Sequence, residues 1–245
     1  MTTFAPNGVL GKESKLGDIV ASDIRSAAVF DAHDIDYCCG GTVTLGQVCG
    51  QKGLDSAALI GEIEAATKAP LSRNENYAAW EPGFLADYIV NVHHSWLREN
   101  DERIVAYTAK IASVHGGRHP ELLEIAPLFA TIAKDMTVHL REEEETFFPA
   151  IKRAAAAVAA GGPVVAADRA ALDKALEGLF RDHEEIGDAT HRIRALSKSY
   201  ALPADACSSY TVAYGKLAEF EEELHKHVHL ENNVLFPKAR ALLSK

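Results

Sequence analysis

From Pro82 onward, apolar residues recur every three or four positions, and this spacing predicts long amphipathic helices. Three breaks rich in glycine and proline, at 116–120, 161–163 and 203–205, divide this part of the chain. The resulting helices are expected over about 83–115, 121–158, 166–199 and 206–242. Strand patterns are absent and the connections are short, so we predict an all-α fold with a four-helix up-down bundle.

Before this region the chain carries shorter helical patterns. One runs over about 16–30, a second starts near Thr44 and a third near Ser56. Residues 1–13 show no such pattern and are expected to form a loose tail. We therefore predict a small helical domain over 1–67, a polar linker over 68–80 and the bundle over 81–245.

Composition narrows the class of protein. The chain is 47% hydrophobic and 24% charged, as in soluble globular proteins, and its net charge of −10 argues against nucleic acid or an anionic membrane surface as partner. The first residues lack the features of a secretory signal, and no run of 18 apolar residues predicts a membrane span. Four cysteines do not make a disulfide framework in 245 residues, so we expect a cytoplasmic protein.

Two stretches place the same polar residues on otherwise apolar helix faces. Residues 139–149 and 227–237 both read His-x3-Glu-x4-Phe-Pro. Positions i and i+4 lie one turn apart on one face of a helix, so each stretch presents a nitrogen and a carboxylate to one point. The pairs are His139 with Glu143 and His227 with Glu231. Such groups are costly to bury without a partner, so something must satisfy them.

One histidine from each long helix is expected at a common depth in the bundle. These histidines are His94, His139, His183 and His227, with successive spacings of 45, 44 and 44 residues. Residues on antiparallel neighbours lie level when they are equidistant from the connecting turn, and the three midpoints fall in or beside the three breaks. At a rise of ~1.5 Å per residue, the layer lies roughly 30 Å from the turns.

This layer has two interpretations. Histidine–glutamate hydrogen bonds in the core would explain one pair, but two matched pairs and two further histidines favour a metal site. Imidazole and carboxylate without thiolate suit non-heme iron or manganese better than structural zinc. Two carboxylates from opposite helices can each bridge two ions, which leaves two histidines for each ion. His93 competes with its neighbour His94, although apolar residues at helical spacing after His94 favour the latter.

Other polar residues near these helices are assigned to the surface or to connections. Those expected on solvated faces are Glu142, Glu144, Glu145, His225 and His229. His115 and His119 fall in the first connection, too far from the histidine layer to be ligands.

A turn-rich segment with adjacent cysteines, Cys38 and Cys39, interrupts the N-terminal helical pattern. The pair is either two small residues in a tight turn, or an exposed thiol pair that can form a disulfide, donate electrons or hold a metal ion transiently. The flanking residues are Asp34, Asp36, Gly40 and Gly41. The glycines would let another group approach closely, and the aspartates would raise the thiol pKa values. Cys49 and Cys207 are expected to be ordinary helix residues.

With these features the chain resembles the iron–sulfur cluster repair di-iron proteins, a branch of the hemerythrin-like superfamily. The resemblance covers nearly the whole chain and rests on the Asp-Tyr-Cys-Cys-Gly-Gly segment at 36–41 and on the histidine and glutamate set. It implies two non-heme iron ions with an oxo or hydroxo bridge, and it favours His94 over His93. One iron would be held by His94 and His139, the other by His183 and His227, with Glu143 and Glu231 bridging both.

The resemblance also implies a function. Members are associated with repair of iron–sulfur clusters damaged by nitric oxide or oxidative stress, through iron delivery or through reduction of nitric oxide to nitrous oxide. The implied partners are nitric oxide or oxygen and iron–sulfur client proteins, with Cys38 and Cys39 as candidate redox or client contacts. The small N-terminal domain and the acidic surface are also compatible with a homodimer. Oxygen-carrying hemerythrins have a fifth histidine where this chain has Gly187, which would leave room for chemistry at the metal. The alternative function is non-catalytic sequestration of nitric oxide, or sensing of nitric oxide or oxygen.

Overall fold

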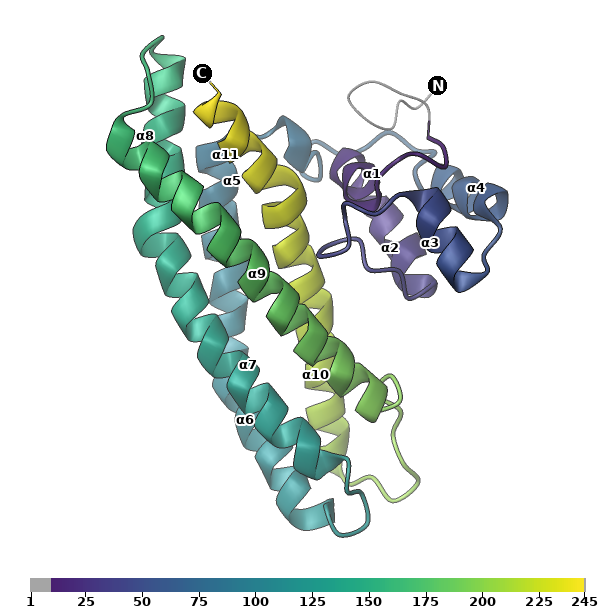
Figure 1. The fold of residues 1–245 in the computed structure, drawn as a ribbon. Helices are drawn as coiled ribbons and strands as arrows, with labels where there is room; N and C mark the ends of the chain where they lie inside the picture. Colours follow the sequence, from purple (N-terminus) through teal and green to yellow (C-terminus); the bar gives the residue numbers. More distant parts are fainter. Residues whose placement is uncertain (1–9, 245) are drawn as a thin grey trace. The chain divides into compact units, whose positions relative to one another are not determined.

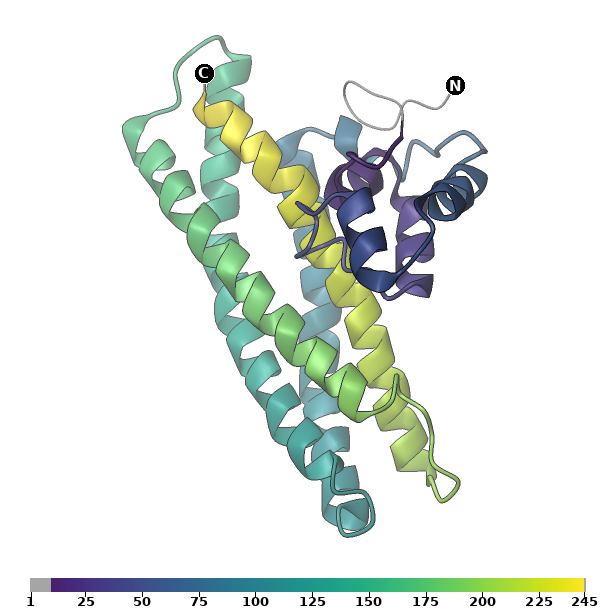
Figure 2. The same ribbon diagram turned by 45° about the vertical axis from the view of Figure 1, so that its right-hand side comes forward.

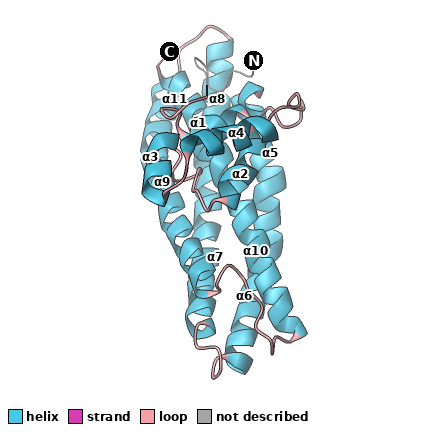
Figure 3. Ribbon diagram, turned by 90° about the vertical axis from the view of Figure 1, so that its right-hand side faces the viewer, coloured by secondary structure: helices cyan, strands magenta, loops and turns pink. Residues whose placement is uncertain are grey.

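The computed structural model describes residues 10–244, which form two compact units. One unit is Ala86–His227, and the other combines Met1–Leu85 with Val228–Lys245. Within the described part of the chain all regular structure is helical (Figure 3), apart from one isolated bridge between Lys15 and Thr44. The all-α prediction is confirmed, and the domain boundaries stay a prediction.

Four helical runs build the unit Ala86–His227. Their α-helices are α5 (Pro82–Ile89), α6 (Ser95–His115), α7 (Leu122–Glu142), α8 (Phe148–Ala159), α9 (Ala166–Leu196) and α10 (Ser208–His229). Both boundaries of this unit fall inside helices. The residues of α5 before Ala86 and the last two residues of α10 belong to the other unit. In Figures 1 and 2 the long helices α6, α7, α9 and α10 lie side by side and alternate in direction, so the up-down bundle is confirmed.

Three of the runs contain a π-helical segment, which the apolar spacing did not predict. The segments are η3 (Val90–His94), η4 (Glu143–Phe147) and η5 (Leu230–Leu235). The last two segments are followed by α8 and α11 (Phe236–Leu243), whose second residues are Pro149 and Pro237. Proline has no N–H and its ring crowds the carbonyl four residues earlier, which disfavours a regular α-turn there. In η3 the Ser95 hydroxyl donates to the Val90 carbonyl at 3.1 Å. Segments of this kind are frequent at functional sites.

The N-terminal helices belong to the other unit. They are α1 (Leu16–Ser22), η1 (Ile24–Ser26), α2 (Ala27–Ala32), α3 (Leu45–Lys52), α4 (Ser56–Ala66) and η2 (Tyr77–Ala79). The helix expected over 16–30 is broken at Asp23, whose extended backbone (φ −154°) lets its carboxylate accept from the Arg25 amide. The helix starts near Thr44 and Ser56 are confirmed, with a capping box of Thr44 and Gln47 at the first.

The expected loose tail is packed where the structure describes it. Leu10 is buried, and the Lys12 carbonyl accepts from the Gly46 amide at 2.8 Å. Residues 1–9, which include the start of the predicted tail and the segment inspected for a secretory signal, lie outside the described residues. No helix of the described part is long and apolar enough to cross a membrane.

Candidate metal centre

Two histidine pairs meet inside the bundle with one glutamate between them. The Nε2 atoms of His94 and His227 are 3.2 Å apart, and those of His139 and His183 are 2.9 Å apart. Glu143 has one carboxylate oxygen 3.4 Å from His94 Nε2 and the other 3.4 Å from His139 Nε2. All five side chains are buried. Glu143 thus faces one histidine pair with each of its oxygens.

This pairing corrects the one that the resemblance implies. The rings of His94 and His227 have centroids 4.9 Å apart and those of His139 and His183 4.7 Å apart, whereas His183 and His227 are 6.3 Å apart. Each helix of an up-down bundle has two neighbours, so a histidine at the right depth can turn to either side. Spacing along the chain fixes the depth only, and side-chain rotation decides the partner.

The geometry of each pair fits a shared metal ion. Histidine nitrogens bind first-row ions at about 2.0–2.1 Å, so two nitrogens on one ion lie about 3 Å apart. Both Nε2–Nε2 distances match this value. The ligand atoms of His94, Glu143 and His227 lie within 4.8 Å of one another, as do those of His139, Glu143 and His183. A carboxylate with one oxygen toward each group is placed to bridge two ions.

Glu231 follows His227 by four residues on the same continuous helical run. Its side chain is fully buried, and it lies in η5 just as Glu143 lies in η4. A buried carboxylate one turn beyond a ligand histidine is suited to the same task. Its role as the second bridge stays a prediction.

Two acidic residues hold the outward nitrogens of the candidate ligands. Glu144 lies 2.6 Å from His94 Nδ1 and also pairs with Arg98, and Asp182 lies 3.5 Å from His139 Nδ1. The hydrogen bond to His139 lowers the pKa of Asp182. Carboxylates in this position fix the tautomer and orientation of a ligand histidine and raise its basicity.

These partners were missed from the sequence. Glu144 was assigned to a solvated face, which is wrong, and Asp182 was not singled out. The rule that placed the four histidines at a common depth would also have identified Glu144 and Asp182. The midpoint of His94 and Glu144 falls in the first break, and that of His139 and Asp182 falls directly before the second.

His93 takes a different place from His94. Its Nδ1 lies 2.5 Å from Glu223, and its ring stacks parallel to His227 at 6.2 Å. Its Nε2 is buried and makes no hydrogen bond among the described residues. The structure therefore directs a ring nitrogen of His94, and not of His93, at the ligand nitrogen of His227.

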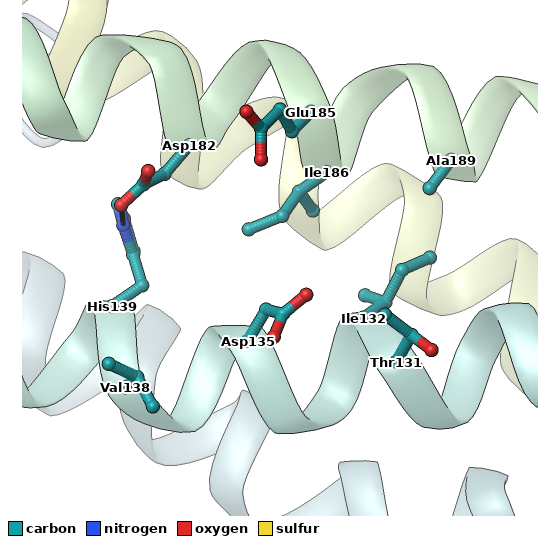
Figure 4. A pocket seen from close by; sticks show the side chains of 9 residues that line it. All are labelled: Thr131, Ile132, Asp135, Val138, His139, Asp182, Glu185, Ile186 and Ala189. Carbon is teal, nitrogen blue, oxygen red and sulfur yellow. Dashed lines mark hydrogen bonds and ion pairs between the residues drawn. The ribbon is translucent and has the colours of Figure 1, made fainter.

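A cavity of about 490 Å³ opens between α7 and α9 beside the second histidine pair. Figure 4 shows His139 and Asp182 facing each other at one end of it. The lining residues are Thr131, Ile132, Asp135, Val138, His139, Asp182, Glu185, Ile186 and Ala189. Three carboxylates among the lining residues make this side of the site attractive to a cation. Gly187 lies half-buried in α9, and its role in leaving room at a metal stays a prediction.

The adjacent cysteines lie in a loop built around Asp36. Its carboxylate accepts from the backbone amides of Cys38, Cys39 and Gly40 at 2.9–3.0 Å, and it lies 3.1 Å from the Cys38 sulfur. Cys38 is buried and Cys39 half-buried, so the prediction of an exposed pair is wrong for Cys38. A hydrogen bond with Cys39 and burial raise the pKa of Cys38, and the charge of Asp36 adds to this as expected. Neither cysteine forms a disulfide.

Two asparagines of η5 hold this loop within the same unit. The Asn233 amide donates to the carbonyls of Tyr37 and Cys38 at 3.1 and 3.3 Å, and Asn232 donates to the Cys38 carbonyl at 3.4 Å. A Cβ on Gly17 would lie 2.1 Å from Asn233 Oδ1, and one on Gly41 would lie 2.4 Å from it. The close approach expected at Gly41 is therefore made by Asn233, and that expected at Gly40 is made by the Asp36 carbonyl.

The surface assignment of His229 is wrong. Its ring is buried edge-on to Tyr37, with centroids 5.8 Å apart, and burial lowers its pKa to about 3. His225 is half-buried beside His191 and Glu221.

The remaining histidines and cysteines lie outside both ligand groups. His115 contacts the sulfur of Cys207 at 3.2 Å and His119 contacts Asp205 at 2.9 Å. Cys207 is exposed directly before α10, and Cys49 is buried in α3.

Comparison with known proteins identifies the family of the chain. Residues 85–239 match the Hemerythrin HHE cation binding domain, and residues 12–67 match a Domain of Unknown function (DUF542). The chain is 31% identical over 230 residues to the iron–sulfur cluster repair protein ScdA of Staphylococcus haemolyticus (strain JCSC1435), covering 94% of this chain and 99% of that protein. It is 28% identical over 230 residues to the iron–sulfur cluster repair protein YtfE of Enterobacter sp. (strain 638), covering 94% and 98%.

Proposed function

Because the chain belongs to the family of iron–sulfur cluster repair proteins with a hemerythrin HHE domain, we propose that it repairs iron–sulfur clusters by means of two iron ions held in its bundle. The observation that carries this proposal is Glu143, whose two oxygens each face a separate buried histidine pair. One ion would bind His94 and His227, the other His139 and His183. Glu143 and Glu231 would bridge them.

The protein's own residues prepare this site. Glu144 and Asp182 hold the outward nitrogens of His94 and His139, so that the inward nitrogens stay directed at the metal positions. Iron, when bound there, supplies electron transfer to a small ligand such as nitric oxide or oxygen, or is itself handed to a client protein. The acidic cavity beside His139 favours the second use, because its carboxylates attract a cation and not a neutral gas.

Reduction of nitric oxide is the second candidate route. Two nitric oxide molecules, two electrons and two protons give nitrous oxide and water. Oxidation of the Cys38 and Cys39 thiols to a disulfide releases two electrons and two protons, so the pair could balance one such turnover. The loop around Asp36 would have to open first, because Cys38 is buried. We place the activity in the cytoplasm, where reductants keep both cysteines as thiols.

Iron transfer tests the first route. The purified protein is expected to hold about two irons per chain and to support cluster assembly on an apo iron–sulfur protein with sulfide, under anaerobic conditions, at the expense of its own iron. Cluster assembly is followed by absorbance. Assembly without loss of iron from the protein would contradict delivery.

Anaerobic addition of nitric oxide to the reduced protein tests the second route. Nitrous oxide over many turnovers would support reduction, whereas a stable nitrosyl species without nitrous oxide would indicate sequestration or sensing. A variant with Cys38→Ser and Cys39→Ser is expected to keep the iron spectrum and to lose repair activity. Full repair by this variant would make the pair structural.

A further inference from the structure

A second group of metal-type ligands lies on α9 and α10, outside the centre described above. It consists of His191, Glu221 and His225, whose ligand atoms lie within 4.8 Å of one another. Glu221 and His225 are four residues apart on α10, and the ring of His191 on α9 lies 6.2 Å from that of His225. His191 follows His183 by eight residues, so the group lies about 12 Å along α9 from the bundle site.

Glu221 is unusually well fixed for a residue near the surface. Its side chain is only 4% exposed, and its Oε2 accepts from Arg194 Nη1 at 2.9 Å. Its other oxygen, Oε1, is buried and makes no hydrogen bond of ordinary geometry in the described part of the chain, and the Tyr200 hydroxyl is the neighbour that interacts with this carboxylate. A buried carboxylate oxygen is costly to leave unsatisfied, so a ligand at Oε1 would relieve that cost. Arg194 holds the carboxylate in place through the other oxygen, as residues behind a metal ligand commonly do.

The turn after α9 contributes to the same environment. Lys198, Ser199 and Tyr200 all adopt left-handed backbone conformations, with φ of 53°, 56° and 60°. Three such non-glycine residues in a row are strained and persist only where surrounding contacts hold them. This turn buries the Tyr200 hydroxyl, and the pKa of Tyr200 is raised first by burial and further by the charge of Glu221 and a hydrogen bond with it. The strained turn therefore places an aromatic side chain next to Glu221.

We propose that His191, Glu221 and His225 form a mononuclear site for a divalent first-row transition-metal ion. Two imidazoles and one carboxylate are a common ligand set for such ions, and ferrous iron is bound by this set in non-heme sites. Three protein ligands leave coordination positions to water. The exposed ring of His191 makes the site accessible, so exchange of the ion should be fast.

In the cell the ion would be ferrous iron entering or leaving the bundle, and this part of the inference rests on the proposed function. The site would then hold iron for transfer to or from the buried histidine pairs. Its ligands are more exposed than those pairs, which suits transient binding, whereas the buried pairs suit retention.

Cobalt(II) added anaerobically to the full, iron-loaded protein tests the site. We expect one further ion per chain, with visible absorbance of bound cobalt, and at least tenfold weaker binding in His191→Ala and in His225→Ala. Glu221→Gln should weaken binding as well, but the two histidine variants decide the matter because removing a buried charge can disturb folding. His119→Ala, which removes another histidine paired with a carboxylate, is the matched control and should bind cobalt as the parent does.

Two results would overturn the site. One is no cobalt beyond the bundle, and the other is equal binding by the parent and the variant lacking both His191 and His225. Its failure is distinguishable from failure of the bundle site. His139→Ala should lose iron and still bind the extra cobalt, whereas the double variant should keep its iron. For the holding role, the double variant should load iron several-fold more slowly to the same final content, and an unchanged loading rate would refute that role.

Discussion

The stretches 139–149 and 227–237 share the plan His-x3-Glu-x4-Phe-Pro, yet the residues that follow the glutamate differ. After Glu143 comes another acid, Glu144, which lies 2.6 Å from the outward nitrogen of His94. After Glu231 come Asn232 and Asn233, whose amides donate to carbonyls of the loop that carries the cysteines. One stretch thus supports a candidate metal ligand, and the other also holds the Cys-Cys loop.

A backbone feature that both stretches share explains why the residues after the glutamate contact groups other than the candidate ligands' inward nitrogens. In both stretches a proline follows a π-helical segment that contains the glutamate. The wider turn of a π segment changes the direction of the residues that follow its start, compared with a regular α-helix. The residue after the glutamate then decides which group is bound. The acid Glu144 contacts the His94 ring, whereas the amides of Asn232 and Asn233 donate to backbone carbonyls.

The largest effect is expected at the first residue of each stretch. His139→Ala and His227→Ala should each lower bound iron from about two ions per chain to about one or none, because each removes a nitrogen from a buried pair. Metal analysis of the purified variants measures this. His93→Ala should keep its iron, since the His93 ring only stacks on His227 while its Nδ1 pairs with Glu223. Unchanged iron in both ligand variants would refute the site.

Gly17→Ala tests the fit of Asn233 against the N-terminal helices. The added Cβ would lie 2.1 Å from Asn233 Oδ1, so the asparagine must move, and we expect a loss of ~1–3 kcal/mol in the free energy of unfolding. Thermal and denaturant unfolding measure it. Gly50→Ala is the matched control, because nothing lies within 4 Å of its Cβ and alanine favours a helix. Equal stability of both variants would show that the contact is not needed.

Much of this arrangement could be predicted from the sequence, and the rest fails for physical reasons. Apolar spacing predicts the four long helices, and the symmetry of His94, His139, His183 and His227 about the breaks predicts their common depth. The depth of a residue in the bundle does not fix the direction in which its side chain points. The predicted pairing of His94 with His139 and of His183 with His227 was therefore wrong. Burial by contacts from a distant segment is invisible in a local pattern, which is why His229 was assigned to the surface.

Glu144→Gln tests the acid that follows the first glutamate. The amide keeps the shape but loses the charge beside His94 and Arg98, so the His94 ring is held less firmly. We expect iron content to stay at about two ions and iron affinity to fall roughly tenfold, as is usual when a residue behind a metal ligand is changed. Competition with a chelator measures it. Glu145→Gln is the neighbouring control, and an equal loss in both variants would assign the effect to overall charge.

Asn233→Ala tests the amide that follows the second glutamate. Its donors to the Tyr37 and Cys38 carbonyls would be lost, and the loop should open more often. One net hydrogen bond is worth about 1 kcal/mol, so alkylation of the buried Cys38 should speed up about fivefold. Mass spectrometry after iodoacetamide treatment measures this, with exposed Cys207 as the internal reference. Asn91→Ala, which removes an asparagine donor from the other unit, should leave Cys38 unchanged. If Cys38 reacts at the parent rate in Asn233→Ala, the loop is held by its Asp36 hydrogen bonds, and the two stretches differ less than their contacts suggest.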